Sequence, residues 1–150
     1  NRAWDAGLVV VVAAGNNGPR TMSITTPGIS RKVITVGCSD DDREVLVGGN
    51  RMVDYSGRGP TAACICKPDL VAPGCSVVSC SSRADKYTIK SGTSMSTPIV
   101  SGAVALLLER FPDMSNKDVK LRLRESSVDI GLPRNQQGWG MLNVEKMIGK

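Results

Sequence analysis

Residues 91–108 read SGTSMSTPIVSGAVALLL, and this stretch decides what kind of fold the sequence encodes. Its first half is polar and contains Ser94, whereas Ala103–Leu108 is apolar on every side. A segment that is apolar all round indicates a buried helix rather than an amphipathic one. We therefore expect a long buried helix over Thr93–Arg110, with a serine at its start.

Ser94 is placed where a helix offers unpaired backbone N–H groups. The first N–H groups of a helix have no intrahelical partner, and the helix dipole adds partial positive charge there. A hydroxyl beside such a site is suited to attack a carbonyl carbon. Pro98 lacks an N–H and clashes with the carbonyl four residues back, so we expect the first turn to open around Ser94. The alternative is that Thr93 or Ser94 only caps the helix, and this segment alone favours the cap.

A second informative stretch is the apolar run Leu8–Ala14, which is closed by Gly-Asn-Asn-Gly at residues 15–18. Such a run predicts a strand that is buried on both faces of a parallel sheet. Asn16 then follows the carboxyl end of that strand, where ligands of α/β sheets bind. Its amide is suited to donate to a developing oxyanion. A plain Asn-Gly turn is the alternative.

The rest of the chain alternates short strands with helices. Residues 1–7 predict the tail of a helix that a glycine closes. Strands are expected over Lys32–Cys38, Met52–Ser56 and Asp69–Ala72, and a turn or hairpin over Ser39–Asn50. An antiparallel pair of strands is expected over Ser76–Cys80 and Lys86–Lys90. Two helices are expected later in the chain, one from a capping box at Ser115 to about Ser126 and one over Val144–Ile148. This order indicates an α/β fold with a mostly parallel sheet that is covered on both faces.

The composition narrows the class of protein. A chain of 150 residues suits one domain. Its formal charge of +5 is spread along the sequence without a basic cluster between aromatic residues, so we expect no nucleic acid as a partner. The first seven residues do not form a signal peptide, and the longest apolar runs are too short to span a bilayer, so we expect no membrane either.

The chain has five cysteines, which is an odd number for a disulfide framework. They are Cys38, Cys64, Cys66, Cys75 and Cys80. No histidine and no pair of Cys-x-x-Cys motifs is present to complete a metal site, so we expect neither a metal nor a cofactor. Free thiols in a reducing compartment favour a cytoplasmic protein, with secretion as the alternative.

In combination, these segments resemble the subtilisin-like serine proteases (subtilases, peptidase S8 family) along essentially the whole chain. The segments that carry the resemblance, in the family's order and at about its spacing, are VVVVAAGNNGP, VITVG, DYSGRGP, KPDLVAPG, SGTSMSTPIVSGAVALLL and GWGMLNV. The resemblance implies the C-terminal portion of a three-layer α/β fold, with residues 1–150 as a partial catalytic domain. In that fold a buried helix follows the nucleophilic serine.

The resemblance also implies a role for each motif residue. Ser94 is then the nucleophile, and Asn16 shares the oxyanion hole with the backbone N–H of Ser94. Ala13, Ala14 and Gly15 match the strand end that forms one wall of a substrate pocket. The family orders its triad as Asp, His and Ser, and the segments with the first two are expected upstream of residue 1. Since the chain has no histidine, we expect it to be inactive alone.

The expected partners follow from this interpretation. They are a peptide or protein substrate and the missing N-terminal part of the same domain. Without that part the strand at Leu8–Ala14 has an open edge, which invites a strand-paired or swapped oligomer. Some relatives bind a cation near the segments that match Gly28–Val33 and Lys67–Asp69, where Lys67 adds a positive charge that would replace or exclude it.

Two alternatives to an active protease stay open. One is a catalytically dead subtilase-like module for binding or scaffolding. The other is a nucleotide-binding α/β domain built on the loop Gly15–Gly18, which lacks both the G-x-G-x-x-G pattern and a helix directly after the glycines.

Overall fold

The computed structural model describes residues 1–82 and 86–149. The helices are α1 Arg2–Asp5, α2 Thr93–Arg110, α3 Asn116–Ser126, α4 Arg134–Gln137 and α5 Val144–Ile148. The strands are β1 Val11–Ala13, β2 Ile34–Cys38, β3 Val45–Val47, β4 Asn50–Met52, β5 Leu70–Ala72, β6 Val77–Cys80 and β7 Tyr87–Lys90. None of the helices in this part of the chain is long and apolar enough to cross a membrane.

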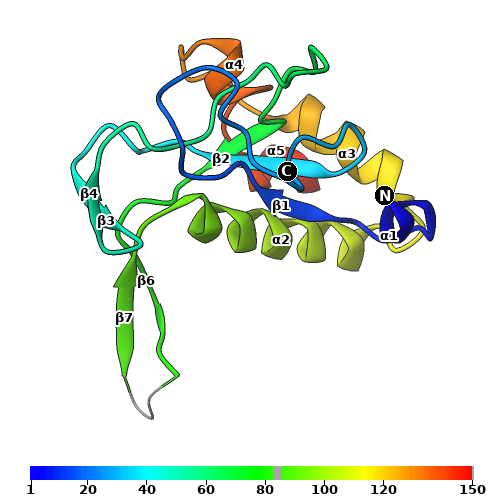
Figure 1. The fold of residues 1–150 in the computed structure, drawn as a ribbon. Coiled ribbons are helices and arrows are strands. Elements are labelled where there is room, and N and C mark those ends of the chain that lie inside the picture. Colours follow the sequence, from blue (N-terminus) through cyan, green and yellow to red (C-terminus); the bar gives the residue numbers. More distant parts are fainter. Residues whose placement is uncertain (83–85, 150) are drawn as a thin grey trace.

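The centre of the fold is a parallel sheet with the order β1-β2-β5 (Figure 1). The middle strand β2 reads ITVGC, is rich in β-branched residues and is buried throughout. Strand β1 pairs with β2 on one side, with Val12 opposite Thr35. Its other edge has no strand partner among the described residues. The expected strand over Leu8–Ala14 therefore forms only over Val11–Ala13, and it is half-buried rather than buried on both faces.

Helix α2 packs along the sheet and lies below it in Figure 1. Its buried side chains Val100, Val104 and Leu107 join the core that includes Ile34 and Val36 of β2. The helix has the predicted bounds and runs unbroken through Pro98. The prediction that it is buried all round is wrong, since Leu106 is 50% exposed. Only one side of α2 meets the sheet, and no described element covers the opposite side.

Helices α3 and α5 complete the same core. The predicted capping box is present: the Ser115 hydroxyl accepts from the Asp118 N–H, and the Asp118 carboxylate accepts from the Ser115 N–H at 3.0 Å. Leu123 of α3 and Met147 of α5 are fully buried in the core. Both helices were predicted, whereas the single turn of α4 was not.

The other face of the sheet is covered by loops and by α4. The Thr35 hydroxyl donates to the Gly28 carbonyl, and the backbone N–H of Cys38 donates to the Ser56 hydroxyl. Helix α4 contacts β2. The α/β fold class with a parallel sheet is thus confirmed, with loops in place of long helices on this face.

Two antiparallel hairpins extend from the body. The pair predicted over Ser76–Cys80 and Lys86–Lys90 is confirmed as β6 and β7, and the predicted hairpin within Ser39–Asn50 appears as β3 and β4. The strand predicted over Met52–Ser56 is wrong beyond Met52. Asp54 adopts a left-handed backbone conformation with φ of 51°, which ends the extended run.

A buried ion pair joins the loops to the sheet. The Lys67 side chain is 1% exposed, and its ammonium donates to the Asp69 carboxylate at 2.5 Å and to the Val33 carbonyl at 3.0 Å. Asp69 also accepts from the Thr35 N–H at 2.7 Å and pairs with Lys120 at 3.4 Å. Burial lowers the pKa of both lysines, and the charge of Asp69 opposes that change. One carboxylate thus serves as the counter-charge of two ammonium groups.

We predict that Asp69→Asn destabilises the fold by about 3–5 kcal/mol, because it leaves the buried Lys67 ammonium and the partly buried Lys120 ammonium without their shared counter-charge. The exposed pair of Asp5 and Lys32 provides the control, and Asp5→Asn is expected to change stability by less than about 1 kcal/mol. Urea unfolding followed by circular dichroism measures both values. Equal midpoints for the two variants contradict the role given to Asp69.

Candidate functional site

The start of α2 is held at the carboxyl ends of the sheet strands. Gly92 occupies the N-cap position with φ of 139°, a conformation that favours glycine. Its N–H donates to the Gly74 carbonyl at 2.9 Å, and the Ser96 hydroxyl donates to the Ala72 carbonyl at 2.9 Å. No side chain caps the helix. The interpretation of Thr93 or Ser94 as the cap is therefore wrong, and Ser94 is left for another role.

Thr93 fixes the orientation of the Asn16 side chain. The Thr93 N–H and the Thr93 hydroxyl both donate to Asn16 Oδ1 at 3.0 Å, and the hydroxyl oxygen accepts from the Gly15 N–H at 3.2 Å. Two donors therefore hold the oxygen end of the amide. Asn16 Nδ2 has no hydrogen-bond partner within the described residues. The amide thus presents two unused N–H donors beside the start of α2.

Ser94 lies next to this amide as the second residue of α2. Its side chain is exposed, and neither its hydroxyl nor its backbone N–H has a hydrogen-bond partner in the part of the chain that the structure describes. A Cβ built on Gly92 lies 3.3 Å from Asn16 Nδ2, which places this nitrogen against the backbone that leads into Ser94. The structure therefore brings together the two residues predicted from separate segments.

Sequence reasoning missed the role of Thr93. Its only sequence signal is that it stands directly before Ser94, and nothing in residues 91–98 links it to a segment 77 residues away. The structure shows that it connects the strand end at Gly15 with the helix start. We regard it as a positioning residue for Asn16.

The strand end beside Asn16, which is predicted as one wall of a substrate pocket, is only partly accessible. Ala13 and Gly15 are half-buried, whereas Ala14 is fully buried. The Ala14 carbonyl accepts from the Thr25 N–H at 2.9 Å, and Gly15 has φ of 95° with Thr25 packed where a side chain would extend. Ala14 therefore offers no surface to a ligand, and its role is to anchor the loop.

A base for the Ser94 hydroxyl is missing from this arrangement. The sequence has no histidine, and no described carboxylate forms a hydrogen bond with Ser94. Asp40 follows strand β2, and its Oδ1 accepts from the N–H groups of Gly74 and Cys75 at 2.8 and 3.1 Å. The described residues thus place an exposed hydroxyl beside N–H groups without a partner, but no base is hydrogen-bonded to that hydroxyl.

Cys38, the buried cysteine among the five, is not an alternative nucleophile. Burial raises its pKa to about 12, although the Tyr55 hydroxyl near its sulfur at 3.2 Å acts in the opposite direction. Nucleophilic cysteines need a lowered pKa. All five cysteines of the chain are unpaired.

Residues for a metal centre are not gathered in residues 1–82 and 86–149, where no group of three or more His, Cys, Asp or Glu side chains is found. Near the segments Gly28–Val33 and Lys67–Asp69, where some relatives bind a cation, the chain places the ammonium groups of two lysines. Lys120 Nζ donates to the consecutive carbonyls of Arg31, Lys32 and Val33 at 2.9, 3.1 and 2.9 Å. The buried Lys67 lies on the other side of the same Val33 carbonyl.

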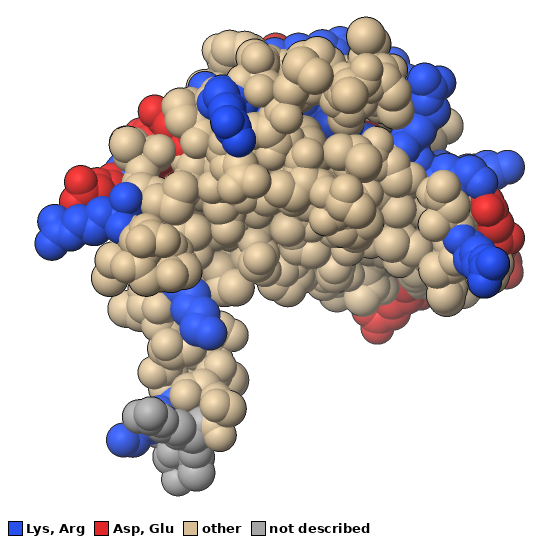
Figure 2. All heavy atoms as spheres, viewed as in Figure 1, with Lys and Arg blue, Asp and Glu red and all other residues tan. Residues whose placement is uncertain are grey.

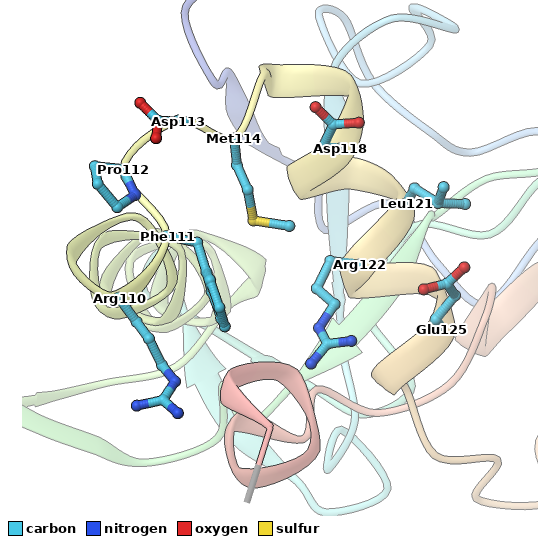
Figure 3. A pocket seen from close by; sticks show the side chains of 9 residues that line it. All are labelled: Arg110, Phe111, Pro112, Asp113, Met114, Asp118, Leu121, Arg122 and Glu125. Atoms are coloured by element: carbon cyan, nitrogen blue, oxygen red, sulfur yellow. The ribbon is translucent and has the colours of Figure 1, made fainter.

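A cavity that Ser94 does not line lies elsewhere in the chain. It has about 630 Å³ and sits between the end of α2 and α3 (Figure 3). Its lining is Arg110, Phe111, Pro112, Asp113, Met114, Asp118, Leu121, Arg122 and Glu125. These residues include no serine, threonine, cysteine or lysine that would serve as a nucleophile, and Arg122 is engaged with the Met147 carbonyl at 2.7 Å. The cavity therefore gives no alternative active site.

The sequence is similar to known serine proteases along almost its whole length. A profile described as the subtilase family of S8 peptidases matches residues 1–140. Serine protease AprX of Bacillus subtilis (strain 168) is 42% identical over 161 residues, and the match covers 97% of this chain and 36% of AprX. Subtilisin DY of Bacillus licheniformis is 35% identical over 147 residues, with 97% of this chain and 48% of the relative covered.

Solved structures agree with the fold. A mutant of the protease domain of PatA superimposes with a TM-score of 0.74 at 27% identity, covering 97% of this chain and 49% of that one. The prenylagaramide maturation protease PagA has a TM-score of 0.75 at 24% identity, which supports the fold alone. The chain spans about half or less of the length of these relatives.

Proposed function

The chain belongs to the subtilase family, and on this premise we propose that it is the nucleophile-bearing part of a serine endopeptidase. The observation that carries the proposal is the hydrogen-bonded unit of Asn16 and Thr93 beside an exposed Ser94. It supplies a hydroxyl and oriented N–H donors at one point, as hydrolysis through an acyl-enzyme requires.

The first chemical step follows from these groups. Ser94 Oγ attacks the carbonyl carbon of the scissile peptide bond, and the carbonyl oxygen gains negative charge. That oxygen accepts from the backbone N–H of Ser94 and from Nδ2 of Asn16, which Thr93 holds by its oxygen end. Donors that are already oriented need no reorganisation as the charge develops, so they stabilise the transition state more than the substrate.

The hydroxyl proton requires a base that these 150 residues do not contain. In the proposed enzyme it passes to an imidazole in the remaining part of the catalytic domain and then to the leaving amine, after which water releases the acyl group. The chain by itself is therefore proposed to be inactive.

A binding or scaffolding module without catalysis is the second candidate. It is favoured only by the lack of histidine in this chain. A module without chemistry has no need for a hydroxyl left unbonded beside an amide whose oxygen end is fixed by two donors. This arrangement supports the protease over the module.

The proposed partners are a peptide or protein substrate and the rest of the catalytic domain. Beside the free edge of β1 lies a hollow of about 380 Å³, lined by Leu8–Val11 together with Ser101 and Val104 of α2. Leu8 is 60% exposed, which is unfavourable for an apolar side chain next to an open strand edge. We propose that the remaining strands of the domain cover this edge.

A prediction for the open edge concerns the chain alone. We expect the 150-residue chain to associate at micromolar concentration, because the edge of β1 and the hollow beside it are uncovered. Size-exclusion chromatography with light scattering gives the mass. The double variant Leu8→Lys/Ser101→Lys is expected to reduce association, while Leu46→Lys on β3, where Leu46 is 63% exposed, leaves it unchanged. If the unsubstituted 150-residue chain is monomeric at this concentration, the proposal is wrong.

For the nucleophile, we predict that a fluorophosphonate probe labels Ser94 in the complete enzyme. Mass spectrometry of the labelled peptide locates the adduct, and Ser94→Ala is expected to abolish it. Ser96 is a matched control, because its buried hydroxyl is bonded to the Ala72 carbonyl and Ser96→Ala leaves the probe's target in place. The isolated chain is expected to label poorly for lack of a base. Labelling that survives Ser94→Ala rules out this assignment.

For the oxyanion donor, we predict that Asn16→Leu in the complete enzyme lowers kcat by roughly a hundred- to a thousandfold with little change in KM, a range that was itself measured on a subtilisin. Thr93→Val removes one of the two donors to Asn16 Oδ1 and is expected to lower kcat to a smaller extent, again without raising KM. Steady-state kinetics with a peptide substrate separates the two constants. If kcat is unchanged in Asn16→Leu, the residue only forms a turn.

A further inference from the structure

A second surface with binding chemistry lies at the opposite end of the sheet from Ser94. A hollow of about 330 Å³ has an apolar floor of Trp4, Leu121 and Trp139, and Arg31, Lys117 and Arg124 stand at its rim. We call it the tryptophan groove. It borders the residues that precede β2, whereas Ser94 and Asn16 lie where the strands end. Figure 2 shows Lys and Arg side chains gathered toward the side where α1 and α3 lie.

The groove continues into a second hollow. That hollow shares Arg124 and Trp139 with the first and extends to Arg134, and it has about 340 Å³. Its one acidic side chain is Asp129, which accepts from the Gly131 N–H and from the Gln137 amide, both at 2.8 Å. Basic side chains therefore line both of the adjoining hollows.

Two of the basic side chains that line the groove are already paired with a carboxylate. Lys32 at the rim pairs with Asp5 at 2.6 Å, and Lys120 beneath the floor pairs with Asp69. The remaining basic side chains have no ion-pair partner among the described residues, and they are Arg31, Lys117, Arg124 and Arg134. Three of these four, Arg31, Lys117 and Arg124, line the groove itself, and Arg134 lines the adjoining hollow. Like charges so placed repel one another, so an anionic partner that enters the groove is stabilised by them.

The floor decides which anion fits. Carboxylates on aliphatic stems can pair with the basic rim while their methylene groups lie on Leu121 and Trp139, whereas a bare inorganic anion gains nothing from an apolar floor. Nucleic-acid bases need exposed ring faces for stacking. Trp4 is only 7% exposed, and the Lys120 ammonium already lies 5.8 and 6.0 Å from the centroids of the Trp4 and Trp139 rings.

We propose that the tryptophan groove binds an acidic, glutamate-rich peptide segment of a partner protein. Because the groove and Ser94 lie at opposite ends of the strands, a bound segment leaves Ser94 accessible. The groove is then a docking site separate from the substrate-binding edge, and the proposal holds whether or not Ser94 is a nucleophile.

The two tryptophans of the chain make this proposal directly measurable. They are Trp4 and Trp139, and both line the groove, so all tryptophan emission of the protein originates there. The experiment titrates the full chain with Ser94→Ala, which prevents cleavage, with a fluorescein-labelled peptide of alternating Glu and Leu. We expect a saturable change in tryptophan emission and in peptide anisotropy that added salt weakens.

Charge reversals at the rim test the assignment of residues. Lys117→Glu/Arg124→Glu is expected to weaken binding by roughly tenfold or more, because two attractive charges become repulsive. Arg20→Glu/Arg43→Glu is the control matched in charge, since these two exposed arginines form no described ion pair and do not line the groove. Circular dichroism confirms that each variant is folded.

Four results overturn the proposal. They are the absence of a binding signal, equal binding of a Lys–Leu peptide, tighter binding of a single-stranded oligothymidylate, and an equal variant-sensitive change in emission with inorganic phosphate alone. The third result assigns the groove to nucleic acid, and the fourth assigns it to a small anion.

Discussion

The carboxylate of Asp69 joins the middle strand of the sheet, a loop and helix α3 through one set of contacts. It begins the turn into β5, accepts from the backbone of β2 at Thr35, and pairs with Lys67 and Lys120. Through those two lysines it also fixes the carbonyls of residues 31–33, where the loop enters the middle strand. A buried charge is tolerated only when it is paired and hydrogen-bonded, so this set of contacts has to form as a unit.

The opposite end of the sheet is organised by neutral hydrogen bonds. Gly92 and Ser96 tie the start of α2 to the residues that follow β5, and Thr93 ties it to Gly15 and Asn16 after β1. Helix α2 is long and packs on all three strands, so its first turn is rigidly placed. The exposed Ser94 and the oriented amide of Asn16 therefore lie together although no hydrogen bond joins their side chains in the described part of the chain.

The two ends therefore serve different chemistry. At the carboxyl ends of the strands, the chain offers a hydroxyl and N–H donors, which suit a neutral carbonyl that becomes an oxyanion. At the amino ends, it offers basic side chains over an apolar floor, which suit a group that is already anionic. Between them lie the free edge of β1 and the exposed side of α2, the surface on which we propose that the remaining part of a subtilase domain packs.

The sequence by itself determined the local elements and the family. Helix α2, the capping box at Ser115 and the β6–β7 hairpin follow from apolar periodicity, cap chemistry and turn signals, which are local properties. It also allowed Ser94 and Asn16 to be predicted as residues of one site, because the order of the motifs matches one family. It did not predict that β1 is half-buried or that Leu106 is exposed, since burial depends on which elements surround a strand or helix.

Only the tertiary structure decided how distant residues act on one another. The bond from Thr93 to Asn16 spans 77 positions, and the contact of Lys120 with the carbonyls of residues 31–33 spans almost 90. The tryptophan groove likewise combines residues near position 4, position 31, α3 and position 139, so basic residues that look evenly spread along the sequence form one surface. Hydrogen-bond geometry and charge pairing act through space over a few ångströms, and no periodicity in a linear chain records that proximity.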